Sequence, residues 1–326
     1  MALVWSGNAL HPSALAVLDG QATLFVSNVG EANAWYAEAA TADAILLRGT
    51  TLMTGEEMDR IGPRLRIIAR AGIGVDRIDL AAATKRGILV VNTPDGPTES
   101  TAEHAIALLL NLCKQVMVGD RMLRLQRSFP LYSELPLGLE TVGTVLGLVG
   151  LGRIGSRVAT IAKVLGMRVL AYDPFVTAER ASALGVEVMH SLEELLTRSQ
   201  VFSLHCPALP ETYHILNAQT LGLMPRGSYL INVARGTLVD TDALLAALRS
   251  GQLAGAGLDV FEPEPPPPDH PLFSLPNTIC TPHIGSYTGA SVERMQVMAC
   301  EEIAQALRGE RPKDLVNQEV WGRQRR

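Results

Sequence analysis

The sequence has few cysteines and no long apolar run. Its four cysteines, Cys113, Cys206, Cys280 and Cys300, form no CxxC pair and no metal-ligand spacing with the seven histidines. We therefore expect reduced, mostly buried thiols and no bound metal. The strongest apolar run, residues 105–113, is far shorter than the ~20 residues that a transmembrane helix needs, and no signal-peptide pattern precedes the first apolar stretch. We expect a cytoplasmic protein without a membrane partner.

Basic charge is also scarce. The net charge is -5, and the one basic cluster, GRQRR at residues 322–326, is expected to be a frayed tail. A nucleic-acid-binding protein needs a basic surface, so we expect no nucleic-acid partner. The rest of the composition, 47% hydrophobic and 19% charged residues, is typical of a soluble α/β protein, and 326 residues are enough for two domains.

Short apolar runs alternate with helical segments through the first hundred residues. This alternation is typical of parallel strands joined by crossover helices. Strands are predicted at residues 22–27, 43–49, 65–72 and 88–93. Helices are predicted between them at residues 31–40 and 80–87, and one long helix is predicted over residues 99–118.

A glycine-rich turn opens a second series of strands and helices. The predicted strand at residues 144–149 runs into Gly150, Gly152 and Gly155, spaced as GxGxxG, and a helix follows to about Leu165. In such a turn the first glycine makes the tight bend, the second admits a pyrophosphate and the third packs the helix on the strand. The helix N-terminus offers its amides to the phosphates. The spacing predicts a dinucleotide site.

Asp173, at the end of the next predicted strand, strengthens this prediction. It stands near the ~20-residue offset expected for an acid that binds the ribose hydroxyls. A carboxylate there favours NAD, because it repels the 2′-phosphate of NADP. The alternative is that Asp173 only opens a turn before Pro174. Further strands are predicted at residues 201–207, 229–235, 254–261 and 277–282, which completes a doubly wound domain.

Charged side chains follow several of these strands. An unpaired guanidinium is costly inside a buried strand, so Arg235 is expected where the strand beginning at Tyr229 leaves the sheet. Asp259 and His283 also come at or just after strand ends, and Glu264 lies in the adjoining loop. Ligands of doubly wound sheets lie beyond these ends. A solvated arginine and a helix-capping histidine are the structural alternatives, but an arginine, a carboxylate and a histidine together favour an active site.

Five motifs of the sequence resemble the D-2-hydroxyacid dehydrogenase family. They are GLGRIG, INVARGTLVD, GLDVFEPEP, TPHIGSYT and RAGIGVDRIDL. The closing RGERPKDLVNQEVW is similar to phosphoglycerate dehydrogenases and to hydroxypyruvate or glyoxylate reductases. The resemblance implies an α/β homodimer with two doubly wound parallel-sheet domains. A Rossmann NAD-binding domain, residues 101–287, would be inserted into a smaller flavodoxin-like substrate domain, residues 1–100 and 288–326. Because the chain stops at residue 326, we expect no C-terminal regulatory domain.

The resemblance also implies roles for individual residues. Arg235 would bind the substrate carboxylate. His283 would be the acid when a 2-keto acid is reduced and the base when a D-2-hydroxy acid is oxidised, with Glu264 holding its imidazole. Other substrate contacts would come from the backbone amides of Gly72, Ile73 and Gly74. Cofactor contacts would come from Gly150, Gly152, Arg153, Ile154, Gly155, Asp173, Cys206, Ala234, Asp259 and Thr101.

The identity of the substrate stays open. Arg48 and Arg70 resemble positions that hold a substrate phosphate, but each is equally interpreted as a solvated charge at a strand end. Phosphohydroxypyruvate, hydroxypyruvate and glyoxylate are therefore all expected candidates. The prolines at residues 265–268 should stiffen the loop after Glu264 as polyproline II.

Three other functions are compared with this one. A formate dehydrogenase would carry glutamine in place of Glu264. A nucleotide-sensing corepressor would keep the same residues and differ only in lacking turnover. A methyltransferase-like nucleotide binder would not combine Asp173 with the arginine, glutamate and histidine.

Overall fold

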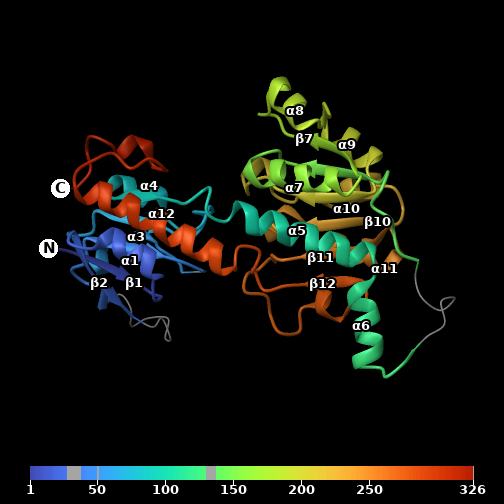
Figure 1. Ribbon diagram of the computed structural model, residues 1–326, viewed down its shortest axis with the longest axis horizontal. Coiled ribbons are helices and arrows are strands. Elements are labelled where there is room, and N and C mark those ends of the chain that lie inside the picture. The colour runs from blue at the N-terminus through green and yellow to red at the C-terminus, as the bar shows by residue number, and fades with distance from the viewer. Residues whose placement is uncertain (28–37, 50, 130–136, 326) are drawn as a thin grey trace. The chain divides into compact units, whose positions relative to one another are not determined.

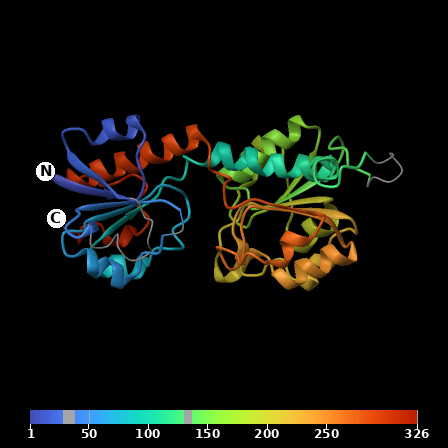
Figure 2. The same ribbon diagram turned by 90° about the horizontal axis from the view of Figure 1, so that it is seen from below.

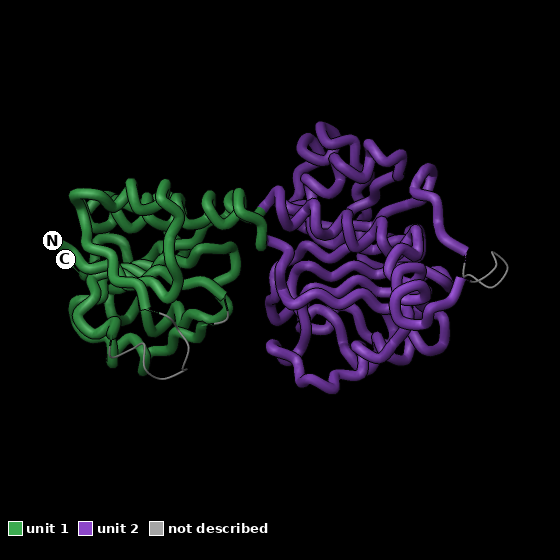
Figure 3. The backbone as a smooth tube through the Cα atoms, turned by 60° about the horizontal axis from the view of Figure 1, so that its bottom comes forward, with its two compact units in different colours: residues 1–97, 287–326 green, residues 98–286 purple. Residues whose placement is uncertain are grey.

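The computed structural model of the protein describes residues 1–27, 38–49, 51–129 and 137–325. The chain folds into two compact units, residues 1–97 with 287–326 and residues 98–286 (Figure 3). The sequence predicted these boundaries at 100/101 and 287/288. Each unit is built on its own parallel sheet, so the expected α/β class is confirmed. No helix among the described residues is both long and apolar enough to cross a membrane.

Unit 1, residues 1–97 and 287–326, contains a five-stranded sheet in the order β2-β1-β3-β4-β5. This is the flavodoxin-like order. The strands are β1 (Ala2–Ser6), β2 (Ala22–Val26), β3 (Ala44–Leu47), β4 (Ile67–Arg70) and β5 (Leu89–Val91). The sequence analysis missed β1, whose place is decided by parallel pairing with β2 on one side and β3 on the other.

Helices cover both faces of this sheet (Figure 2). One face packs against α1 (Pro12–Leu18) and α12 (Gly289–Leu307), and the other packs against α3 (Gly55–Ile61) and α4 (Leu80–Lys85). The short 3-10 helix η5 (Gln318–Val320) lies near the end of the chain. The helix predicted at residues 31–40 lies largely outside the described residues.

The expectation of a frayed C-terminal tail is wrong for its described residues. The Arg325 amide donates to the carbonyl of Gly87 at 2.8 Å. The Arg325 guanidinium donates to the carbonyls of Gly62 and Leu65 at 3.2 and 3.1 Å. Gly62 ends α3, where carbonyls lack partners within the helix. The tail therefore satisfies backbone groups of unit 1, a pairing that a basic cluster in a sequence does not reveal.

Unit 2, residues 98–286, contains a seven-stranded parallel sheet in the order β12-β11-β10-β9-β6-β7-β8. The strands are β6 (Val145–Val149), β7 (Arg168–Tyr172), β8 (Glu187–Val188), β9 (Val201–Leu204), β10 (Ser228–Asn232), β11 (Leu253–Leu258) and β12 (Thr278–Cys280). The direction of the strand order reverses between β6 and β9, as in a Rossmann fold. The carboxyl ends of these two strands therefore form the switch point where ligands bind.

The helices of unit 2 form two layers (Figures 1 and 2). One layer packs on the sheet through α5 (Thr98–Cys113), α7 (Arg153–Val164) and α8 (Ala178–Leu184). The other contains α9 (Leu192–Arg198), α10 (Ala218–Leu223) and α11 (Thr241–Ser250). The remaining short elements are the 3-10 helices η2 (Pro210–Thr212), η3 (Gly236–Leu238) and η4 (Pro271–Ser274).

The prediction of one helix over residues 99–118 is wrong. The helix α5 ends at Cys113, and α6 (Val116–Arg124) begins after Gln115, which has a left-handed φ of 56°. The carbonyl of Cys113 accepts the amide of Leu139 at 2.7 Å. A segment from beyond α6 thus satisfies the end of α5, and this distant partner explains why a local apolar pattern missed the break.

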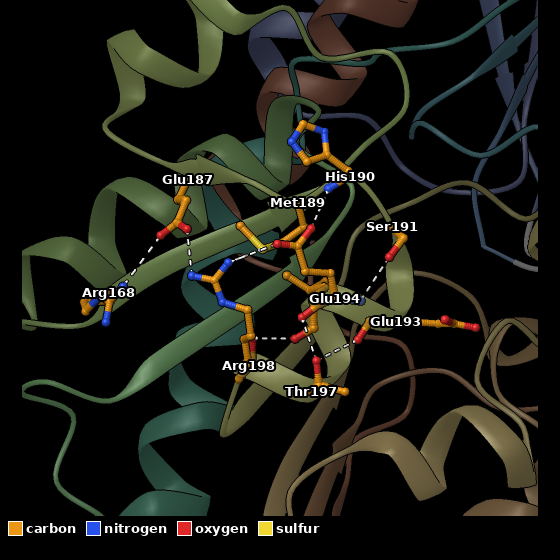
Figure 4. Close-up of polar contacts among 11 residues, drawn as sticks. Arg168, Glu187, Met189, His190, Ser191, Glu193, Glu194, Thr197 and Arg198 are labelled. Carbon is orange, nitrogen blue, oxygen red and sulfur yellow. Dashed lines mark hydrogen bonds and ion pairs between the residues drawn. The ribbon is translucent and has the colours of Figure 1, made fainter.

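Polar contacts tie α9 to the outer strand β8 (Figure 4). The Ser191 hydroxyl accepts the Glu194 amide at 3.1 Å, and Glu194 accepts the His190 amide at 3.0 Å. Arg198 pairs with Glu187 at 2.7 Å and with Glu194 at 3.1 Å. Such partly exposed ion pairs each contribute at most about 1 kcal/mol. This charge cluster therefore orients a surface helix, and its residues need no catalytic explanation.

Candidate active site

The glycine-rich turn lies at the switch point of unit 2. Gly150 follows β6 with φ 97°, and a Cβ there would lie 2.8 Å from the Cys206 amide nitrogen. A Cβ on Gly155 would collide with the carbonyl oxygen of Gly150. These two glycines are required by close backbone packing, as the motif predicts.

Gly152 differs from the other two glycines because its surroundings are open. It is the N-cap of α7, it makes no side-chain cap, and a Cβ there would have no atom within 4 Å. The first turn of α7 begins with Arg153 and Ile154, which are exposed and half-buried. An uncapped helix N-terminus beside an open glycine has the amides and the space that a pyrophosphate needs. The residues present therefore fit a dinucleotide.

Asp173 stands directly after β7 and contacts the glycine turn. Its Oδ2 accepts the Leu151 amide at 2.7 Å, and its Oδ1 accepts the Phe175 amide at 2.9 Å. The second bond forms the turn that was considered as the alternative interpretation. The first bond holds the carboxylate beside the predicted phosphate loop. Asp173 therefore makes the turn and also contacts the glycine turn, and its contact with the ribose stays a prediction.

Residues at the end of β9 pack against the glycine turn. The His205 amide donates to the Val149 carbonyl at 2.8 Å, and the His205 ring lies 2.9 Å from the Ser203 hydroxyl. Burial lowers the pKa of His205 to about 3, so its imidazole is neutral. Burial also raises the pKa of the Cys206 thiol to about 11, which excludes a reactive thiolate. The cofactor contact expected of Cys206 stays a prediction and does not involve a thiolate.

Arg235 lies where β10 leaves the sheet, as predicted, and is the N-cap of η3. The buried Asn232 shapes this turn: its Nδ2 donates to the Arg235 carbonyl at 2.8 Å and its Oδ1 accepts the Ala234 amide at 3.0 Å. A Cβ on Gly236 would collide with the backbone of Phe261. The Arg235 turn therefore packs directly on the segment that leads to Glu264. The sequence analysis missed the roles of Asn232 and Gly236.

Glu264 and His283 form the central contact of the site. His283 Nδ1 lies 2.6 Å from Glu264 Oε1, and the two side chains are 43% and 19% exposed. Burial alone would raise the pKa of Glu264, but the His283 hydrogen bond and charge, a backbone bond at Phe261 and the Arg235 charge together lower it. Glu264 is therefore a carboxylate. Arg235, Glu264 and His283 belong to one electrostatic cluster within unit 2.

Asp259 follows β11 and is 1% exposed. Its carboxylate accepts the Thr281 hydroxyl at 2.6 Å, the Ile284 amide at 2.9 Å and the Gly285 amide at 2.8 Å. Thr101 of α5 is also buried and borders this loop, because a Cβ on Gly285 would lie 3.6 Å from it. Both residues lie beneath the His283 loop. The cofactor contacts expected of Asp259 and Thr101 stay predictions.

The proline run differs from the expected polyproline II helix. The peptide bonds Glu262–Pro263 and Glu264–Pro265 are cis. At the other end of the run, the His270 amide donates to the Pro267 carbonyl at 3.1 Å and closes a turn. Polyproline II has no internal hydrogen bonds, so the interpretation does not hold at the Pro267 end of the run.

The remaining predicted residues lie in unit 1 at the carboxyl edge of its sheet. Strands β3 and β4 pair Leu47 with Arg70, so Arg48 and Arg70 come at neighbouring strand ends. The Arg48 guanidinium lies 4.9 Å from the centre of the Tyr287 ring. The Arg70 Nε donates to the Gly74 carbonyl at 3.2 Å. This edge of unit 1 therefore carries two arginines beside a glycine loop.

One predicted substrate contact of this loop is corrected by the structure. The Gly72 amide, expected to receive the substrate carboxylate, donates to the Thr93 hydroxyl at 2.8 Å. The Ile73 carbonyl accepts the Asn92 amide group at 2.8 Å. Thr93 is fully buried, so this bond is part of the fold of the loop.

Within the described ranges, no cluster of three histidine, cysteine or carboxylate side chains has the arrangement to hold a metal.

Comparison with known proteins identifies the family. Residues 106–285 match the model of the D-isomer-specific 2-hydroxyacid dehydrogenase NAD-binding domain. A glyoxylate reductase from Korarchaeum cryptofilum is 45% identical over 265 residues, which cover 81% of this chain and 80% of that protein. This chain belongs to the D-2-hydroxyacid dehydrogenase family. The expected NAD-dependent oxidoreductase is thereby confirmed, together with its cofactor.

Other members of the D-2-hydroxyacid dehydrogenase family are similar over most of the chain. A D-3-phosphoglycerate dehydrogenase from Mycobacterium leprae is 43% identical over 85% of this chain but only 51% of that protein, so the chain spans about half of that relative. A Thermus thermophilus protein structure matches with a TM-score of 0.86 and 40% identity, covering 96% of this chain and 99% of that one. A D-lactate dehydrogenase from Aquifex aeolicus, solved with NAD and lactic acid, has a TM-score of 0.82 and 35% identity, covering 94% and 96%.

Proposed function

We propose that this chain reduces a small 2-keto acid to a D-2-hydroxy acid with NADH, and that Arg235, Glu264 and His283 perform the protein's part of the reaction. The observation that carries this proposal is the 2.6 Å contact between His283 Nδ1 and Glu264 Oε1. A carboxylate at this distance stabilises an imidazolium and fixes its orientation. A general acid needs both properties.

Each residue has a separate task in this proposal. The planar guanidinium of Arg235 binds the substrate carboxylate with two donors and orients the adjoining 2-oxo group. Because Glu264 holds Nδ1 of His283, Nε2 is the nitrogen that gives its proton to the carbonyl oxygen. In the oxidative direction the neutral His283 takes the hydroxyl proton through the same nitrogen. When bound, the cofactor supplies or accepts the hydride.

The glycine turn and Asp173 are proposed to hold the NAD. Gly150 and Gly155 set the backbone of the turn, and the open surroundings of Gly152 leave room for the pyrophosphate. Asp173 would bind the ribose hydroxyls with the lone pairs that its two backbone bonds do not use. Further contacts are proposed for Arg153, Ile154, Cys206, Ala234, Asp259 and Thr101.

We propose a substrate of the glyoxylate, hydroxypyruvate or phosphohydroxypyruvate type. Relatives named glyoxylate reductase and D-3-phosphoglycerate dehydrogenase support this range. The edge of unit 1 would take part through Ile73, Gly74, Arg48 and Arg70. The Arg48 guanidinium contacts the face of Tyr287. A cation held on an aromatic ring keeps its N–H groups available to an anion.

Two other functions remain as outcomes of the test. A formate dehydrogenase from Granulicella shares the fold, with a TM-score of 0.84 and 28% identity. Glu264 disfavours that activity, because the formate dehydrogenase pattern has glutamine there. A nucleotide-sensing corepressor would bind NADH without turnover. Only an assay separates it from an enzyme, since it would keep the same residues.

We also propose a homodimer. Several large apolar side chains of unit 2 are exposed within one stretch of sequence on and after α6, and exposed apolar surface favours an interface. They are Val116, Leu123, Leu125, Phe129, Leu137 and Val142, with exposures from 52% to 92%. Sedimentation velocity at micromolar concentration tests this, and a monomer would contradict it.

A cytoplasmic location is proposed from the free cysteines, and no nucleic-acid partner is expected at a net charge of -5.

The decisive experiment is an NADH-oxidation assay with glyoxylate, hydroxypyruvate, phosphohydroxypyruvate and pyruvate, with NAD plus formate as a separate reaction. We expect turnover of at least one 2-keto acid and none of formate. The variant His283→Ala should lose on the order of 10²- to 10⁴-fold in kcat, as is usual for a general acid, and should still bind NADH. Turnover of formate alone supports the formate dehydrogenase, and NADH binding without any turnover supports the corepressor.

A further inference from the structure

The backbone of His283 is in an unusual conformation. Its φ is 55°, in the left-handed region that residues with a side chain seldom occupy. A residue with a side chain is strained there and requires support from its surroundings. The Glu264 carboxylate bonds to the His283 imidazole, and the His283 amide donates to the Thr281 carbonyl at 3.0 Å. The residues on either side of His283 are bonded in turn by a buried carboxylate of unit 2.

Asp259 provides bonds on both sides of His283. Its Oδ1 binds the Thr281 hydroxyl at 2.6 Å on one side and the Ile284 amide at 2.9 Å on the other. Its Oδ2 binds the Gly285 amide at 2.8 Å. Burial opposes ionisation, but the bonds from His104, Thr281 and the two amides lower the pKa of Asp259 and keep it charged. A buried carboxylate thus spans the strained residue.

Thr281 connects this carboxylate to helix α5. The Thr281 hydroxyl donates its only proton to Asp259, so it acts as the acceptor toward His104, whose Nε2 lies 3.0 Å away. The same Nε2 lies 3.4 Å from Asp259 Oδ1. His104 is therefore the donor in both contacts. The residues form a chain from α5 to the loop that carries His283.

We propose that Thr281 and His104 are positioning residues for His283. Through Asp259 they hold the loop of residues 281–285 in the shape that places the imidazole against Glu264. Neither residue needs to touch the substrate for this role. The inference rests on the proposed function for its effect on turnover, but its effect on the His283 ring exists without cofactor or substrate.

The first test is Thr281→Val, which removes the hydroxyl and keeps the volume. Thr278→Val is the control, because Thr278 is a buried threonine whose hydroxyl binds the Leu272 and Leu275 carbonyls at 2.7 and 3.0 Å, away from the loop, whereas Thr281 is half-buried. We expect Thr281→Val to lower kcat on the order of 10- to 100-fold, with the NADH Kd unchanged. Thr281→Ser should restore most of kcat, whereas Thr278→Val should lower Tm without lowering kcat.

The second readout is the rate at which diethyl pyrocarbonate modifies His283 in the cofactor-free protein, followed by peptide mass spectrometry. Loss of the Thr281 hydroxyl should loosen the contact of the His283 imidazole with Glu264 and raise this rate severalfold. His104→Leu should raise it too, and His104→Gln, which keeps a donor, should raise it less. Equal rates in Thr281→Val and Thr278→Val would overturn the inference. A raised rate in a protein that reduces no 2-keto acid would support the inference and refute the proposed function.

Discussion

His283 Nδ1 lies 2.6 Å from Glu264 Oε1, although the two residues belong to different loops. Glu264 follows β11 and His283 follows β12, and these strands are parallel neighbours. The carboxyl ends of parallel neighbours meet at one edge of a sheet, which explains how the loops converge. The pKa of Glu264 is lowered despite its burial, so Glu264 is a carboxylate at neutral pH. The His283 imidazole therefore has a charged partner.

The first prediction concerns the pH dependence of this pair. Ketone reduction requires imidazolium, so its rate should fall as rising pH removes that proton, and hydroxy-acid oxidation, which requires the neutral ring, should fall as pH drops. Glu264→Gln removes the negative charge that favours imidazolium. The reductive limb should therefore move to lower pH. The measurement is kcat/KM for reduction against pH in both proteins.

Glu262→Gln is the control for this prediction. Glu262 lies two positions earlier and pairs with His214 at 2.9 Å instead of with His283. Its substitution should leave the reductive limb in place. Superimposable profiles for the parent and Glu264→Gln would remove Glu264 from the proposed mechanism.

The second prediction concerns Arg235. Arg235→Lys keeps the charge but loses the planar pair of donors, so most of kcat/KM for the 2-keto acid should be lost while NADH affinity is nearly unchanged. Arg226→Lys is a matched control, because Arg226 belongs to the same unit and its guanidinium binds the Ser250 carbonyl, outside the cluster. Steady-state kinetics and NADH fluorescence titration measure the two effects. Full activity of Arg235→Lys would support the alternative interpretation, in which Arg235 is a solvated charge of the loop.

The third prediction concerns the choice of dinucleotide. NADH should be preferred over NADPH, and Asp173→Ala should narrow the difference mainly by weakening NADH. Asp173 also accepts the amides of Leu151 and Phe175, so alanine removes two supports of the turns. Asp173→Asn keeps an acceptor for one amide and isolates the loss of charge. Dissociation constants for both dinucleotides decide the matter, and equal efficiency with both in the parent protein would contradict the prediction.

The sequence predicted the parts of the site that depend on local pattern. Apolar runs mark where strands end, so Arg235, Asp259 and His283 were expected at strand ends, and each follows its strand. The spacing of Gly150, Gly152 and Gly155 likewise reflects packing within a few residues of the turn. Periodicity and turn chemistry act over such short distances.

Contacts between distant segments were missed because no local pattern carries them. His104 meets Thr281 across 177 positions, and Arg325 meets Gly62 across 263 positions. The break after Cys113 likewise depends on an amide beyond α6. In each case tertiary pairing outweighs the preference of the local segment.

The last prediction concerns acid stability. The pKa of His205 is about 3 in the folded protein because of burial and about 6.5 when exposed. Below pH 6.5 the unfolded chain therefore binds a proton that the folded protein does not, and stability falls as pH drops toward 3. From pH 7.5 to pH 5 this group alone should cost about 2 kcal/mol.

His205→Gln removes this titration while leaving a group that can bond to the Ser203 hydroxyl. Its Tm should be lower than that of the parent at pH 7.5, because a buried residue is changed, but it should fall less between pH 7.5 and pH 5. His190→Gln, at an exposed histidine of the same unit, is the control and should follow the parent. Calorimetric scans of the three proteins without cofactor measure this. If the parent and His205→Gln lose the same Tm on acidification, the imidazole of His205 is not the buried neutral group that supports the glycine turn.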